Sequence, residues 1–134
     1  MIVLADTSAW SRFYRNDFVD TDPVVAALTN EISTRGVCTT GMVYLELLRG
    51  FTRSTTRETI EQHFDAVPFI EPTRTDYQGA ADISLTCRRG GVQIDSVDAL
   101  IAQICITNNL TLLTADTDFV HAARHVPLSL WTTT

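Results

Sequence analysis

The segment MIVLAD, residues 1–6, is an uninterrupted apolar run that stops at an aspartate. A strand with one face in water would alternate apolar and polar side chains, whereas a continuous run is typical of a strand buried on both faces. Central strands of parallel sheets show this pattern. We therefore expect Met1–Ala5 to form a central parallel strand, with Asp6 just beyond its carboxyl end.

Strand-like and helical segments alternate along the rest of the chain. The expected helices are Thr7–Arg15, Val24–Thr34 after Pro23, Met42–Phe51, Thr56–Phe64, Thr75–Arg89, a helix from near Asp95 to Asn109, and Asp116–His125. The further expected strands are Val37–Thr40, Ala66–Ile70, Thr111–Thr114 and Leu128–Trp131. Pro68 places its strand at an edge. The alternation predicts an α/β fold: a three-layer α/β/α sandwich around a central parallel sheet of about five strands.

Length and composition favour one domain. The chain has 134 residues, 45% of them hydrophobic, which suits a single domain over residues 1–134 with a real core. No apolar stretch approaches the roughly 20 residues that span a bilayer, so we expect a cytoplasmic protein without membrane association. Cys38, Cys87 and Cys105 lack the spacing of metal ligands and are expected to be buried free thiols.

The charge balance argues against a protein that holds nucleic acid by bulk electrostatics. The formal net charge is −6, and such binding depends on Lys and Arg neutralising phosphates. The objection weakens if the negative charge is gathered at one spot and balanced there by divalent cations. The chain has no Lys, so all ten basic residues are Arg, which suits bidentate contact with phosphate.

Four carboxylates fall where an α/β sheet places its functional sites. Asp6 follows the first predicted strand and Asp116 follows the strand Thr111–Thr114. If these strands are neighbours, their separation of about 4.8 Å brings both side chains within reach of one ion. Glu46, in the helix after the second strand, and Asp98, in the first turn of a later helix, are expected to converge on the same edge.

Such a cluster of acids predicts a site for hard metal ions. Carboxylates held a few ångströms apart raise one another's pKa, and a cation relieves this repulsion. Oxygen-only ligands select Mg²⁺ or Mn²⁺. Sites of this kind hydrolyse phosphodiesters, with one ion or with two about 3.5 to 4 Å apart, and need no Ser or Cys nucleophile.

Each acid also has a structural interpretation that remains open from the sequence alone. Asp6 and Asp116 stand where helix caps are common, and Asp118 where a first-turn charge is favourable. Glu46 is compatible with a solvated helix face, three residues before Arg49. Asp95 followed by Asp98 resembles a capping box.

Four pieces of sequence together resemble the PIN-domain family, and more narrowly the VapC-type toxins of VapBC toxin–antitoxin pairs. They are DTSAW at Asp6–Trp10, YLELLRG at Tyr44–Gly50, DALIA at Asp98–Ala102 and LTADTDF at Leu113–Phe119. Each piece is weak alone, but the four in this order and spacing are specific. The resemblance extends over nearly the whole chain.

The resemblance implies a function and a set of partners. It implies that Asp6, Glu46, Asp98 and Asp116 hold Mg²⁺ or Mn²⁺, with Asp118 as a possible fifth member. Thr7 and Thr114 would be accessory polar residues. It further implies a homodimeric endoribonuclease toxin that cleaves tRNA or ribosomal RNA and is silenced by a VapB-like antitoxin.

The RNA-contacting residues are sought among the arginines near these segments. Those that could rim the site are Arg12, Arg15, Arg49, Arg53, Arg88 and Arg89, and the main candidates among them are Arg12, Arg49 and Arg53. The alternative function is a catalytically silent PIN-like module that binds RNA or protein. Receiver domains of phosphotransfer systems share the fold class, but their site uses a Lys, which this chain lacks.

Overall fold

A parallel sheet lies at the centre of the computed structural model, which describes residues 2–15 and 21–132. Its strands are β1 (Val3–Ala5), β2 (Val37–Cys38) and β3 (Thr111–Leu113), in the order β2-β1-β3. Val3 pairs with Val37 on one side and with Thr111 on the other. All three β1 residues are fully buried, which confirms the expected central strand; Met1 lies outside the described residues.

The prediction of about five strands is wrong for the two edge segments, because three strands form within the described residues. Segment 66–70 contributes one parallel bridge, Thr39 with Phe69, and segment 128–131 contributes one, Leu112 with Leu130. Pro68 has no N–H to donate, which limits the pairing of the first segment. Both bridges lie at the outer edges of the sheet, beside β2 and β3, and the edge position of the Pro68 segment was expected, so the α/β/α architecture stands.

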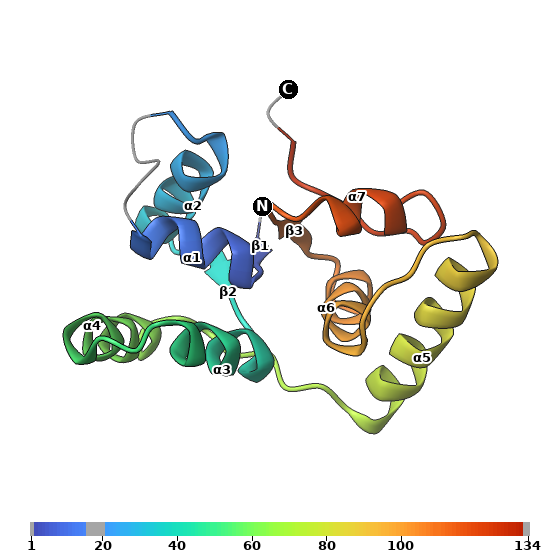
Figure 1. Ribbon diagram of the computed structural model, residues 1–134, viewed down its shortest axis with the longest axis horizontal. Helices are drawn as coiled ribbons and strands as arrows, with labels where there is room; N and C mark the ends of the chain where they lie inside the picture. The colour runs from blue at the N-terminus through green and yellow to red at the C-terminus, as the bar shows by residue number, and fades with distance from the viewer. Residues whose placement is uncertain (1, 16–20, 133–134) are drawn as a thin grey trace.

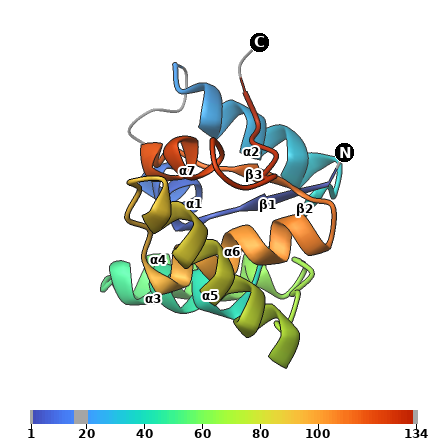
Figure 2. The same ribbon diagram turned by 90° about the vertical axis from the view of Figure 1, so that its right-hand side faces the viewer.

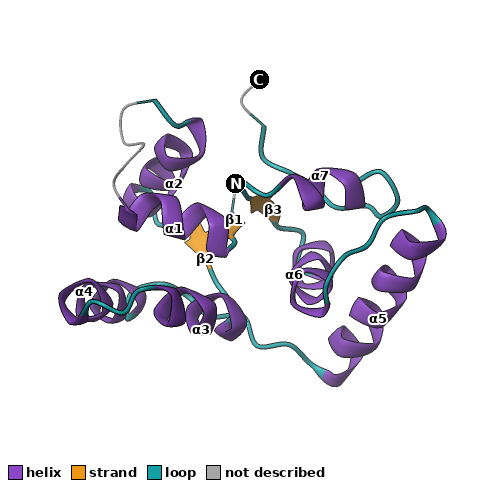
Figure 3. Cartoon of the chain, viewed as in Figure 1, coloured by secondary structure: helices purple, strands orange, loops and turns teal. Residues whose placement is uncertain are grey.

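Seven helices surround the sheet within the described residues (Figures 1 and 3). They are α1 (Thr7–Arg15), α2 (Pro23–Ser33), α3 (Gly41–Gly50), α4 (Ser54–Phe64), α5 (Arg74–Arg89), α6 (Ser96–Thr107) and α7 (Thr117–Ala122). Figures 1 and 2 show α2 on one side of the sheet and α5 and α6 on the other. The last helix is shorter than the expected Asp116–His125, because Asp116 is its N-cap and Ala123 is already its C-cap.

Local signals account for several helix ends. Pro23 occupies the first turn of α2, and the Asp22 side chain accepts a hydrogen bond from Val24 N–H. Thr73 and Asp76 form a reciprocal capping box at the start of α5. After α5, Gly91 has a φ of 82°, the left-handed region that favours glycine.

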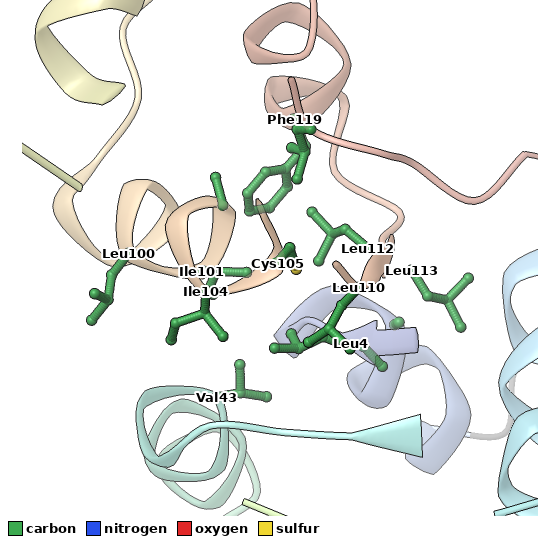
Figure 4. Close-up of a cluster of buried hydrophobic side chains, with 14 of the residues drawn as sticks. Leu4, Val43, Leu100, Ile101, Ile104, Cys105, Leu110, Leu112, Leu113 and Phe119 are labelled. Carbon is green, nitrogen blue, oxygen red and sulfur yellow. The ribbon is translucent and has the colours of Figure 1, made fainter. Parts of the chain in front are cut away.

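One hydrophobic cluster joins the layers. Figure 4 shows side chains from β1, α3, α6, β3 and α7 meeting around Leu4, Ile104 and Leu112, all of which are fully buried. The three cysteines are buried and free, as expected. No helix in the described ranges is both long and apolar enough to cross a bilayer. The core therefore fixes β1 and β3 side by side, which places the residues after them.

Candidate functional site

Asp6 is a buried carboxylate at the carboxyl end of the central strand, with 4% of its surface exposed. Its Oδ1 accepts hydrogen bonds from Ser8 Oγ at 2.6 Å and from the backbone N–H of Ala9 at 3.1 Å. Its Oδ2 accepts one from Thr114 Oγ1 at 2.7 Å. The bond from Ala9 also caps α1, so the capping interpretation and a site at this position are compatible.

Two hydroxyl groups tie the ends of β1 and β3 together. Ser8 Oγ lies 3.2 Å from Thr114 Oγ1 and accepts a hydrogen bond of 2.9 Å from Ala115 N–H. Thr114 Oγ1 in turn accepts a bond of 2.9 Å from Asp116 N–H. This network holds the Asp6 carboxylate in one orientation and positions the turn that carries Asp116.

Three further carboxylates gather beside this turn. Asp98, Asp116 and Asp118 each offer an oxygen, and these oxygens lie within 4.8 Å of one another. Asp116 is the N-cap of α7, accepting a bond from Asp118 N–H at 2.9 Å, and Asp98 lies in the first turn of α6. We call Asp98, Asp116 and Asp118 the acidic cluster.

Asp98 is placed by a cap that the sequence predicted. Asp95 is the N-cap of α6 and accepts a hydrogen bond of 2.8 Å from the backbone N–H of Asp98. Only this half of the expected capping box is seen between these two described residues. The Asp98 side chain places an oxygen beside those of Asp116 and Asp118.

Glu46 approaches from α3 and is fixed by a neighbour of Asp6. Thr7 Oγ1 donates a hydrogen bond of 2.8 Å to Glu46 Oε1, which links the first turn of α1 to the middle of α3. Glu46 is half-buried. A Glu on a purely solvated helix face would not be held by a residue 39 positions away in the chain.

The electrostatics show that these acids share one region. The pKa of Asp98 is raised from 3.8 to about 7, mainly by burial and in addition by the negative charges of Asp95, Asp116, Asp6 and Glu46. Burial also raises the pKa of Asp6, while its hydrogen bonds from Ser8, Thr114 and Ala9 oppose the increase. The concentration of negative charge is costly unless protons or cations balance it.

The donor set suits a hard divalent cation. Every candidate ligand is a carboxylate, with no sulfur or imidazole among Asp98, Asp116 and Asp118. Oxygen-only sites of this kind favour Mg²⁺ or Mn²⁺ over softer metals. The residues present therefore fit such an ion.

The three carboxylates of the acidic cluster are not the same set as the expected quartet. Asp118, expected as a possible fifth member, is in the acidic cluster, while Asp6 and Glu46 lie next to it, each held by hydroxyl groups. Sequence reasoning gave Ser8 no role at the site and missed its hydrogen bond to Asp6. The signal available was a hydroxyl residue two positions after an acid at a strand end.

The three candidate arginines lie in different parts of the structure. Arg12 lines a groove that also contains Asp116, and its guanidinium forms an ion pair of 2.8 Å with Asp22. Arg49 lies in the last turn of α3, and Arg53 precedes α4; both are exposed. An RNA-contacting role of Arg49 and Arg53 stays a prediction.

Comparison with known proteins places the chain in a family. The model of the PIN domain family matches residues 3–125. Comparison with curated protein sequences gives no match.

Solved structures with the same fold include three that cover nearly the whole chain. FitAcB from Neisseria gonorrhoeae has a TM-score of 0.75 at 18% identity, covering 98% of this chain and 97% of that one. VapBC2 from Rickettsia felis, bound to a promoter DNA fragment, has a TM-score of 0.73 at 18% identity, covering 98% and 100%. VapC20 from Mycobacterium tuberculosis, described as a sarcin-ricin loop cleaving toxin, has 0.65 at 16%, covering 94% and 98%. Because the family model matches residues 3–125, most of the chain, this chain belongs to the PIN domain family.

Proposed function

We propose that this chain is a Mg²⁺- or Mn²⁺-dependent endoribonuclease, the toxin of a VapBC-type toxin–antitoxin pair. The observation that carries the proposal is the acidic cluster, whose three carboxylates offer oxygens within 4.8 Å of one another. Asp6 and Glu46 stand beside it, near enough for their charges to raise the pKa of Asp98. Membership of the PIN domain family supports the same reading.

Asp98, Asp116 and Asp118 would hold the cation, with Asp6 and Glu46 completing its surroundings. A bound divalent ion at such a site supplies an activated water and offsets the charge of a phosphate. Asp98, with a pKa of about 7, would ionise fully once positive charge is placed beside it. The site thus gathers carboxylates that a cation and a phosphate can share.

The remaining residues of the site position these acids. Thr114 and Ser8 donate to opposite oxygens of Asp6, and Thr7 donates to Glu46. Hydrogen bonds to ligand carboxylates restrict their rotation, so less order must be imposed when a ligand binds. The Ser8 hydroxyl is committed to Asp6 and Ala115, which favours a supporting role over attack on phosphorus.

The names of similar structures support the substrate and the partner. The structures from Neisseria gonorrhoeae and Rickettsia felis are of FitAcB and VapBC2, and a Klebsiella pneumoniae neighbour is named as a toxin–antitoxin complex. VapC20 is described as cleaving the sarcin-ricin loop. By analogy, we assign this chain an RNA substrate, a VapB-like antitoxin and a cytoplasmic site of action.

A homodimer is also part of the proposal. Leu45 on α3 is 50% exposed and Tyr77 on α5 is 58% exposed. An apolar groove of about 290 Å³, which includes Met42 and Tyr77, lies between α3, α5 and α6. Large exposed apolar side chains and an apolar groove are both typical of a surface that a second protein covers.

The direct test compares RNA cleavage by the purified chain with and without divalent ions. Total tRNA and ribosomal RNA are incubated with Mg²⁺, with Mn²⁺ or with a chelator, using wild type, Asp98→Asn and Asp116→Asn. Asp82→Asn, an exposed position on α5, is the matched control. We expect cleavage only with metal, and only by wild type and the control. Intact RNA in every reaction would favour the catalytically silent binding module.

A further inference from the structure

We draw no further inference here: the strongest candidate, the apolar groove of about 360 Å³ that Trp10, Tyr14 and Ile32 line between α1, α2 and α4, is an unpartnered apolar face, and nothing in the part of the chain that the structure describes shows what covers it.

Discussion

Thr114 Oγ1 donates a hydrogen bond of 2.7 Å to Asp6 Oδ2, joining residues that lie 108 positions apart in the chain. The bond is possible because β1 and β3 are neighbours, with Ala5 in register with Leu113. Each strand ends at this register, so the residues that follow meet at one edge of the sheet. The acidic cluster lies beside that meeting point.

Ser8→Ala should weaken catalysis through Asp6. The substitution removes the 2.6 Å bond to Asp6 Oδ1 and leaves Ala115 N–H without its acceptor. Loss of a residue that supports a metal ligand typically costs 10–100-fold in activity or metal affinity, and we expect about that range here. Kinetics at saturating Mn²⁺ separate the two effects. Ser33→Ala, which removes an exposed bond to Asn30 O, is the control and should keep full activity.

Asp6→Asn should abolish cleavage while preserving the fold. Asn can still cap α1 and accept from Ala9 N–H, but it lacks the charge of a carboxylate. We expect activity to fall by at least about 100-fold and the circular dichroism spectrum to match that of wild type. A variant with wild-type activity would remove Asp6 from the mechanism.

Stability without divalent ions should decrease as pH rises from about 4 to 8. The pKa of Asp98 is raised from 3.8 to about 7 by burial and by neighbouring acids. Between these values the folded state holds a proton that the unfolded state has released, so stability is highest below the lower value and is lost as pH passes 7. Discounted for solvent screening, the loss from this residue is about 1–2 kcal/mol.

Denaturant unfolding in a chelator at several pH values checks this dependence. Asp98→Asn should be more stable than wild type at pH 8 and should show a shallower decline from pH 5 to 8. The same decline in both proteins would show that Asp98 is not the group responsible. Added Mn²⁺ should restore the stability of wild type at pH 8 by mass action.

Leu45→Glu should disrupt self-association. Leu45 is 50% exposed on α3, and a buried charge without a partner is costly at an interface. Sedimentation velocity at micromolar concentration should show a dimer for wild type and a monomer for the variant. Val120→Glu, at a 45% exposed position on α7, is the control and should stay dimeric. A monomeric wild type would contradict the proposed homodimer.

The sequence was most informative where a single chemical rule dominates. The unbroken apolar run of residues 1–5 predicted a central buried strand, and β1 is paired on both sides and fully buried. Pro23 and Asp95 predicted the starts of α2 and α6, because cap and first-turn preferences are local. The positions of Asp6 and Asp116 after strands predicted that they would share an edge.

The sequence was less informative where an outcome depends on partners far along the chain. The bond between Ser8 and Asp6 is local, but its companions Thr114 and Ala115 lie more than a hundred positions away. The edge segments 66–70 and 128–131 have strand-like composition, yet each pairs through one bridge. Asp118 joins the acidic cluster because Asp116 caps α7 and directs its first turn toward Asp98, which spacing alone does not reveal.

The most direct test of the account is the anomalous difference density of a crystal soaked in Mn²⁺. The account predicts a peak among the carboxylates of Asp98, Asp116 and Asp118, at about 2.0 to 2.2 Å from the nearest oxygens, and no such peak in a crystal of Asp116→Asn. A wild-type crystal without a peak there, at a Mn²⁺ concentration that supports RNA cleavage, would contradict the central claim that this cluster is the metal site.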